Sequence, residues 1–465
     1  MQLNFEENVS GLKKRGELFA SRIPIHISRS PGRLDLMGGN DDYTGGLVFE
    51  STIREGTYAA AQLRTDGKIV VRNPAVAGKG WVSEIVLEID ELSEEQKVVE
   101  WVNRSADIRW TAYVLGNIHY LKKKFPDRIK GGLTLYMDTN VPFNRGVSSS
   151  AAIEVSVMKA SAAAMGIDLS GMELAVACQW VENTIAGSAC GIMDQAAVVT
   201  GKEGYIMPMI CQPCTAEELI RLPEELNIWG IDSGVSHQVS GIEYEAARAA
   251  AFMGYKIICD EAKVPVTLDG STEISRYTDP VWNGYLANLT LSEFREKFES
   301  ILPVQIDKKN YLELHQFHPD PFTPLKDQVT YNILANTRYA VEENHRVQLF
   351  SELSRGASLS GSVRAYQLMG ELMYQSHQAY TSCGLGARAT DFLVELCRKE
   401  GMKNGIYGAK ITGGGAGGTV AILADKKASE VIKRIFVTYS TSGMGNPYLF
   451  EGSSDGADAY GIKVI

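Results

Sequence analysis

The segment RSPGRLDLMGGNDDYTGG, residues 29–46, holds two arginines, three aspartates and five glycines in eighteen positions. It follows IPIHIS (23–28), in which isoleucine occupies every second position. This alternation predicts a half-buried strand that delivers the chain into a charged, glycine-rich turn over 29–46. A solvated loop with surface salt bridges is the structural alternative. A chance surface turn rarely places one arginine so close to several carboxylates, so Arg33, Asp35 and Asp42 are candidate functional residues.

The length and composition limit the classes of protein that this chain can be. Its 465 residues favour two closely packed domains. The formal net charge of −10 excludes a nucleic-acid-binding protein of the usual electrostatic kind. No apolar run reaches the roughly 18 residues of a membrane span, and the N-terminus lacks the apolar core of a secretion signal. Seven thinly spread cysteines suit reduced thiols. We therefore expect a cytoplasmic protein without nucleic-acid or membrane partners.

The segment PFNRGVSSSAA (142–152) places a glycine and three serines directly before a predicted helix. Backbone N–H groups, hydroxyls and the helix dipole together favour an anion at such a position. The structural alternative is a serine cap on a packed helix. Phosphate binding is the functional interpretation.

The segment TGGGAGG (412–418) lies between two β-type runs. Its glycines allow the backbone to approach a ligand closely, because no Cβ intervenes. It has neither the GK[ST] ending of a P-loop nor the strand-then-helix context of a dinucleotide-binding turn. A ligand-contacting loop and a plain tight β-turn therefore both remain open.

These three segments, in this order, resemble the three motifs of the GHMP small-molecule kinases, and of galactokinases in particular. The segments VENTIAGSACGIMDQ and GVSHQVSGIEY resemble further galactokinase segments. The resemblance implies a two-domain α+β fold with the active site in the interdomain cleft. We place the N-terminal domain at 1–210 and the C-terminal domain at 211–465. The less regular residues 256–335 are expected to be an insertion.

The resemblance implies ATP-dependent phosphorylation of a monosaccharide at its anomeric C1 hydroxyl, with ATP and Mg²⁺ as cofactors. Asp194, in GIMDQ, would orient or deprotonate that hydroxyl, and Arg33 would pair with Asp194 and stabilise charge near the transferred phosphate. Ser150 and Glu182 match the magnesium-binding positions of the family. Magnesium prefers hard oxygen ligands and keeps several waters, so these two protein groups suffice.

The sugar and the nucleotide are assigned to further residues by the same resemblance. Asp42 and Tyr244 match sugar-contacting positions, and a carboxylate such as Asp42 can accept hydrogen bonds from two vicinal hydroxyls. Trp110 matches a tryptophan that stacks near adenine, although an aromatic residue on an apolar helix face is more often core. The complete sugar set is Asp42, Gly39, Asn40, Gly191 and Tyr244, and the nucleotide set is Trp110, Gly146, Ser148, Ser149, Ser150, Gly413, Gly414 and Gly415.

The chain departs from the galactokinase signature at Gly39–Asn40, where that signature has Glu-His near the C6 hydroxymethyl group of the sugar. This loss favours a pentopyranose, which has no C6. Several segments also resemble L-arabinokinases, so L-arabinose is the expected substrate. A galactokinase acting on D-galactose is the alternative, followed by a non-catalytic sugar sensor. The extra acids Asp35 and Asp41 would disfavour an anionic sugar if they face the pocket.

Overall fold

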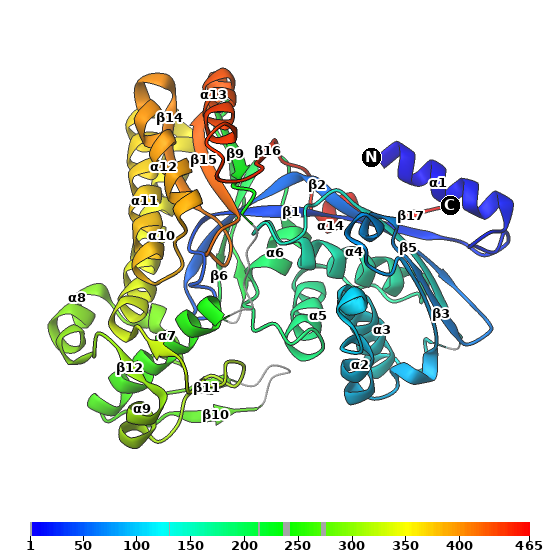
Figure 1. Ribbon diagram of the computed structural model, residues 1–465, viewed down its shortest axis with the longest axis horizontal. Coiled ribbons are helices and arrows are strands. Elements are labelled where there is room, and N and C mark those ends of the chain that lie inside the picture. Colours follow the sequence, from blue (N-terminus) through cyan, green and yellow to red (C-terminus); the bar gives the residue numbers. More distant parts are fainter. Residues whose placement is uncertain (1, 130, 213, 236–241, 271–275) are drawn as a thin grey trace.

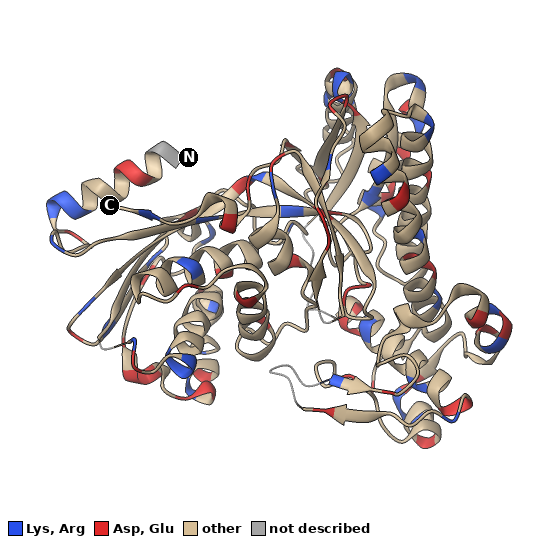
Figure 2. Ribbon diagram, turned by 180° about the vertical axis from the view of Figure 1, so that it is seen from behind, with Lys and Arg blue, Asp and Glu red and all other residues tan. Residues whose placement is uncertain are grey.

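The protein is built around two main β-sheets, each covered by helices, and has two further two-stranded sheets, in a computed structural model that describes residues 2–129, 131–212, 214–235, 242–270 and 276–465 (Figure 1). A mixed helix-and-sheet fold, as predicted, is therefore confirmed. Figure 2 shows that basic and acidic residues are interleaved along the helices. No helix in these ranges combines the length and the apolarity needed to cross a lipid bilayer.

The first sheet is organised around one long strand, β2, which pairs with β1 along one side. On its other side, β2 pairs with β6 near its start and with β5 near its end. Helix α4 contacts both β1 and β2. The strands are β1 (His26–Met37), β2 (Leu47–Leu63), β3 (Lys68–Arg72), β4 (Glu84–Glu88), β5 (Leu133–Thr139), β6 (Tyr205–Ile210), β7 (Thr215–Ala216), β8 (Ile220–Arg221) and β17 (Lys463–Val464).

Most helices of this half pack around a large apolar core, which includes Trp110, whereas α1 contributes to a separate smaller one. Helix α4 is rich in alanine and buried along most of its length, because small side chains let it pack closely on the sheet. The helices are α1 (Gln2–Arg15), α2 (Glu95–Val102), α3 (Ala112–Lys124), α4 (Ser149–Ala164), α5 (Gly171–Thr184), α6 (Met193–Thr200) and α14 (Ala457–Tyr460).

The strand predicted to deliver the chain into the turn is longer than its isoleucine alternation indicates. It continues through the charged residues to Met37, so the turn is confined to 38–46. The strand passes Pro31 with a register irregularity between Pro31 and Arg33, which is how a strand accommodates a residue without an N–H group. Its charged side chains are buried and paired. The charged residues that suggested an exposed turn therefore form polar contacts inside the protein.

The second sheet has four strands in the order β14-β15-β9-β16. Helices α11 and α12 contact β14, and α10 packs along α11. The predicted boundary near residue 210 falls between β6 of the first sheet and β9 of the second, and it stays a prediction. The elements are β9 (Leu226–Asp232), α10 (Ile333–Ser360), α11 (Val363–Ser382), α12 (Arg388–Glu400), β14 (Ile406–Ile411), β15 (Thr419–Asp425), α13 (Ser429–Ser440) and β16 (Tyr448–Glu451).

The chain end returns to the first sheet, where β17 pairs with β1 and α14 contacts α6. The two termini accordingly lie close together in Figure 1. The strands from β1 to β8 and the last strand, β17, thus belong to one sheet, and the four strands of the second sheet lie between β8 and β17 in sequence.

Between α7 and α10 lies a group of short elements with its own small apolar core, built around Trp282, Phe294, Tyr311 and Tyr331. Helix α7 also contacts α10. These elements cover most of the residues expected to be an insertion, which stays a prediction. After α7 (Ile242–Glu261), they are β10 (Thr267–Asp269), β11 (Arg276–Thr278), α8 (Leu291–Glu293), β12 (Ile306–Asp307), α9 (Lys308–His315) and β13 (Thr330–Tyr331).

Candidate functional site

A cavity of about 650 Å³ is lined by most of the site residues that were predicted from the sequence. Its walls come from β1 and the turn after it, the loop before α4, the end of α5, the start of α6, and the first turn of α7. The nominated residues that line it are Arg33, Asn40, Asp42, Trp110, Gly146, Ser148, Ser149, Ser150, Glu182, Gly191, Asp194, Tyr244 and Gly414.

Arg33 and Asp194 form a close ion pair on one wall of the cavity. Nε and Nη2 of Arg33 donate to Oδ1 of Asp194 at 2.9 and 2.6 Å, and Nη1 donates to the carbonyl oxygen of Gly146 at 2.8 Å. Asp194 lies in the first turn of α6, where a negative charge is favoured by the helix dipole. Burial opposes the charge of Arg33, but Asp194 and Glu50 raise its pKa above the usual value. Arg33 is therefore a fixed cation.

Glu50 lies behind this pair, in β2, and sequence reasoning missed it. Its Oε2 is 3.3 Å from Nε of Arg33, and both side chains are almost fully buried. Neither carboxylate oxygen of Glu50 accepts a hydrogen bond. Burial, followed by the charge of Asp35, raises the pKa of Glu50 well above its ordinary value. Arg33 is thus held between an acid that lines the cavity and an acid buried in the sheet.

Asp42 lies in the turn after β1 and approaches Gly191, which precedes α6. A Cβ atom at Gly191 would lie 1.8 Å from Oδ2 of Asp42, so only glycine leaves room for the carboxylate. Oδ1 of Asp42 accepts a hydrogen bond from the backbone N–H of Tyr43 at 2.9 Å. Burial, with the nearby charge of Asp194, raises the pKa of Asp42 to about 6. Gly191 and Asp42, both predicted to contact the sugar, therefore lie against each other at one place in the cavity.

Asn40 and Tyr244 complete this end of the cavity. Asn40 has a positive φ of 58°, a backbone conformation that asparagine tolerates better than most residues. Its side chain is buried, and its Nδ2 donates no hydrogen bond to any residue that the structure describes. The ring of Tyr244 packs edge-on against that of Tyr43, with centroids 6.1 Å apart. Asn40 therefore offers an unpaired donor to a polar ligand.

The serine-rich loop enters α4 in the way expected of an anion-binding turn. Ser148 precedes the helix with a positive φ of 57°, and its side chain makes no capping hydrogen bond. The Oγ atom of Ser148 is buried without a partner, although the residue lines the cavity. The alternative of a plain serine cap therefore does not describe this loop. The geometry instead leaves a hydroxyl and a helix N-terminus free for an anion.

Ser150 and Glu182, the nominated magnesium ligands, lie next to each other in the same cavity. Burial and the charge of Asp194 raise the pKa of Glu182 to about 7, whereas hydrogen bonds from Ser150 and Gln195 act in the opposite direction. Gln195 donates to Oε2 of Glu182 at 2.6 Å, which fixes the carboxylate. A hydroxyl beside an oriented carboxylate is a donor set that fits Mg²⁺.

The glycine-rich segment 412–418 packs against the serine-rich loop, and one of its three nominated glycines, Gly414, lines the cavity. A Cβ atom at Gly413 would lie 2.8 Å from the carbonyl oxygen of Gly146, and one at Gly415 would lie 2.7 Å from Leu385. These two glycines therefore permit contact between chain segments, which differs from the ligand contact expected of them.

Gly39 also differs from its expected place, because it does not line the cavity. A Cβ atom there would lie 2.1 Å from Oδ2 of Asp35 and 2.2 Å from the hydroxyl oxygen of Tyr380. The hydroxyl group of Tyr339 donates to the carbonyl oxygen of Gly39 at 2.5 Å. Two tyrosines from α10 and α11 thus fill the space beside this glycine.

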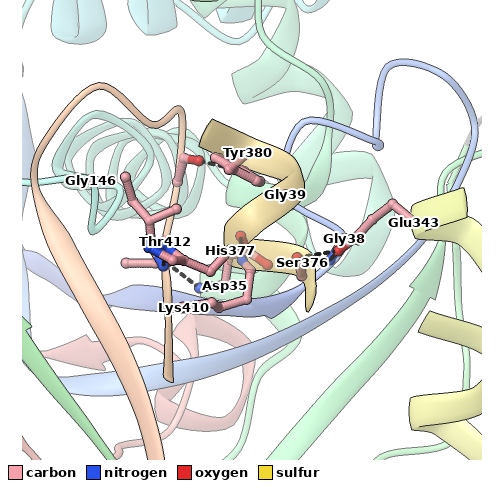
Figure 3. A network of polar contacts seen from close by, with 12 residues as sticks. Asp35, Gly38, Gly39, Gly146, Glu343, Ser376, His377, Tyr380, Lys410 and Thr412 are labelled. Carbon is pink, nitrogen blue, oxygen red and sulfur yellow. Dashed lines mark hydrogen bonds and ion pairs between the residues drawn. The ribbon is translucent and has the colours of Figure 1, made fainter. Parts of the chain in front are cut away.

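The polar network behind the turn joins it to the second half of the molecule (Figure 3). Nζ of Lys410 lies 2.7 Å from Oδ2 of Asp35, and both side chains are fully buried. Oε1 of Glu343 accepts from the backbone N–H of Gly38 at 3.1 Å and from the hydroxyl of Ser376 at 2.6 Å. Neither Asp35 nor Asp41 lines the cavity, so the condition under which they would repel an anionic sugar is not met.

The far end of the cavity is aromatic. Trp110 is buried and donates from Nε1 to the carbonyl oxygen of Val82 at 3.1 Å. Trp81 and Phe143 line the cavity as well, with ring centroids 5.7 Å apart. Sequence reasoning missed both, although Phe143 stands inside the quoted serine-rich segment. Trp81 lies in an irregular stretch whose pattern carries no signal.

The comparisons with known proteins agree with this geometry. Residues 112–202 match the N-terminal domain of GHMP kinases, residues 349–438 match their C-terminal domain, and residues 16–63 match the galactokinase galactose-binding signature. A galactokinase of Chloroflexus aggregans is 28% identical over 91% of this chain and 90% of its own. An L-arabinokinase of Arabidopsis thaliana is 33% identical over 99% of this chain and 48% of its own, so this chain spans about half of that relative.

The fold is shared with a solved galactokinase. The structure of Lactococcus lactis galactokinase complexed with galactose superposes with a TM-score of 0.73, at 21% identity, over 96% of this chain and 98% of its own. The predicted α+β GHMP kinase fold is therefore confirmed. Because both GHMP kinase domains and the galactokinase signature are present in one chain with this fold, the chain belongs to the GHMP kinase family, in its galactokinase-like branch.

Proposed function

We propose that the protein transfers the terminal phosphate of ATP to the anomeric C1 hydroxyl of a monosaccharide. The observation that carries this proposal is a cavity lined both by the Arg33–Asp194 pair and by Ser148, whose hydroxyl has no hydrogen-bond partner among the described residues. The Arg33–Asp194 pair suits a hydroxyl group that accepts the phosphate, and Ser148 suits the phosphates of the donor. Phosphoryl transfer asks the protein mainly to place these two and to neutralise charge.

In this mechanism Asp194 receives the hydrogen bond of the acceptor hydroxyl, and it orients that hydroxyl or takes its proton. Arg33 keeps Asp194 in place through two hydrogen bonds and presents its positive charge to the transferred group. Ser148 and the N-terminus of α4 bind phosphate oxygens. Ser150 and Glu182 would hold Mg²⁺, which supplies charge neutralisation on the phosphates when bound.

Asp42 would bind ring hydroxyls as an ionised acceptor, which makes sugar recognition dependent on pH. Because its pKa is raised to about 6, the carboxyl group takes up a proton below that pH and loses acceptor capacity. We expect kcat/KM for the sugar to fall as pH decreases through about 6, since this ratio reports the free enzyme. A wild-type pH profile of kcat/KM that stays flat between about pH 5 and about pH 7 would contradict this role of Asp42, because its pKa lies within that range.

L-arabinose is the sugar that we propose as substrate, and D-galactose is the alternative. Position 39 offers a C6 hydroxymethyl group no hydrogen-bond partner, because Gly39 has no side chain and Asp35 and Tyr380 fill the space that a side chain there would need. Asn40, the other residue of this pair, lines the cavity with an unpaired donor. The L-arabinokinase relative supports the same choice by its name.

Comparing kcat/KM for the two sugars tests this choice. We expect L-arabinose to exceed D-galactose by at least about tenfold, the effect of one extra group that finds no partner in the pocket. An equal or higher value for D-galactose would show that the Gly39–Asn40 pair does not select the sugar. Sugar binding without ATP consumption would instead favour the non-catalytic sensor.

A further inference from the structure

The cavity has few positive charges for a site that would bind a triphosphate. Among the described residues that line it, the carboxylates outnumber the cations, and no lysine is present. A polyanionic ligand in such surroundings needs a cation that is free to approach it, because unscreened like charges repel strongly at low dielectric. The cations are Arg33, Arg109 and Arg145, and the carboxylates are Asp42, Glu182, Asp194 and Glu245.

Two of these arginines are already engaged. Arg33 is almost fully buried and bonded to Asp194 and to the carbonyl oxygen of Gly146. Arg109 donates from Nη2 to the carbonyl oxygen of Ala186 at 2.8 Å. Neither can turn toward a phosphate chain without giving up those contacts.

Arg145 is different, because its side chain has one loosely arranged ion-pair partner among the described residues. Its Nη1 lies 3.0 Å from Oδ2 of Asp232, but this nitrogen is buried and makes no hydrogen bond of proper geometry to the described part of the chain. The side chain is 25% exposed, whereas that of Asp232 is 2% exposed. A guanidinium that touches a carboxylate without being aligned to it, at the edge of a cavity, can exchange that partner for a better acceptor.

The main chain of Arg145 is fixed where a phosphate-binding side chain would be needed. Its carbonyl oxygen accepts a hydrogen bond from Oγ1 of Thr419 at 2.8 Å, and a Cβ atom at Gly418 would lie 2.9 Å from that oxygen. Arg145 itself belongs to the serine-rich loop, directly before Gly146. The backbone is therefore held by the second sheet, and the side chain is the part that can move.

Asp232 can tolerate the loss of its partner. It ends β9, where burial raises its pKa to about 6, and Oδ1 accepts a hydrogen bond from the backbone N–H of Gly234 at 3.1 Å. Its carboxyl group therefore keeps one hydrogen bond if Arg145 turns away. A protonated carboxyl group left behind avoids the cost of a buried unpaired charge.

We propose that Arg145 is a nucleotide-binding residue that leaves Asp232 and binds the phosphate chain of the nucleoside triphosphate. This inference rests on the proposed function, because it assumes that ATP is the phosphate donor. A guanidinium suits this task, since its planar fork can donate two parallel hydrogen bonds to phosphate oxygens. Asp232 is then a positioning residue, which holds Arg145 at the cavity edge until the nucleotide arrives.

Three variants and three ligands test this proposal. For Arg145→Ala, we expect KM for ATP to rise about 10- to 100-fold, the effect of losing charge-assisted hydrogen bonds, with Kd for adenosine and for the sugar unchanged. Arg145→Lys should recover part of the ATP affinity, because it restores the charge without the fork. Asp232→Asn keeps the shape of the partner but removes its charge, so ATP should bind at least as tightly as to the wild type.

The same measurements show which idea fails. A KM for ATP in Arg145→Ala that stays near the wild-type value would overturn the role of Arg145 and leave the proposed function intact. Equal losses of ATP and adenosine binding would overturn it too, because they indicate a disturbed site. A wild-type protein that binds sugar but not ATP would refute the proposed function itself. If Arg145→Ala does not fold, the single variants Arg145→Lys and Asp232→Asn decide the question. Weaker ATP binding by Asp232→Asn than by the wild type would then overturn the role of Arg145.

Discussion

Replacing Asp194 with asparagine is expected to lower kcat by about 10²- to 10⁴-fold, the usual contribution of a group that positions or accepts a proton. The substitution keeps the size of the side chain. Because Nε and Nη2 of Arg33 both donate to Oδ1 of Asp194, the amide oxygen of asparagine can occupy the same place. What the variant loses is the second carboxylate oxygen and the ability to take a proton from the acceptor hydroxyl.

Nucleotide binding should survive this change, because the proposed phosphate-binding groups, Ser148 and the start of α4, belong to other elements. Kd for ADP and kcat with the sugar should be measured on the same preparation. Asp127→Asn is a matched control, since Asp127 is exposed. Near-wild-type turnover in Asp194→Asn would remove Asp194 from the mechanism, and a parallel loss of ADP binding would indicate that the cavity had collapsed.

The residues found from the sequence are those whose spacing alone carries the signal. Ser148 directly precedes α4 and Ser150 lies in its first turn, and the acids Glu182 and Asp194 stand at fixed positions in segments that resemble galactokinases. The structure brings all four into one cavity. Local pattern was sufficient here, because each residue is placed by the helix that it begins or ends.

The residues missed are those placed by contacts between distant segments. Tyr380 meets the turn at Gly39 across more than 300 positions, and no local pattern indicates which aromatic residue of α11 will do so. Glu50 reads as a polar residue in a strand, yet it is buried behind Arg33. The strand end at about residue 28 was wrong for the same reason: the charged residues after it are stabilised inside the sheet by partners that come from elsewhere in the chain.

Replacing Arg33 with methionine is expected to lower the free energy of unfolding by about 3–5 kcal/mol at neutral pH, the usual cost of removing one partner from a buried ion pair. Asp35 and Glu50 lie directly opposite each other on β1 and β2. Like charges in that position destabilise a sheet unless cations offset them. Lys410 remains bound to Asp35, but Glu50 loses the guanidinium that lies 3.3 Å away.

The loss should depend on pH, in a direction that follows from Glu50. Burial, then the charge of Asp35, already raises its pKa well above the ordinary value, and Arg33 opposes that shift. Without Arg33 the pKa of Glu50 in the folded protein should rise further, away from the value of about 4.3 that it has in the unfolded chain. The folded state then binds more protons, so stability decreases as pH rises. The loss of unfolding free energy in Arg33→Met, relative to the wild type, should be larger at about pH 8 than at about pH 5. Urea unfolding of both proteins at each pH measures this difference.

The double variant Arg33→Met with Glu50→Gln separates stability from catalysis. Glutamine carries no charge at any pH, so the double variant should regain part of the lost stability and should lose most of the added pH dependence. We expect low turnover in Arg33→Met and equally low turnover in the double variant, because neither has the Arg33 cation beside the transferred phosphate. Glu50→Gln alone, with Arg33 still bound to Asp194, should retain turnover. If the double variant were no more stable than Arg33→Met, Glu50 would not be the source of the cost. If it regained turnover, the role of Arg33 would be to hold the sheet together and not to act on phosphate.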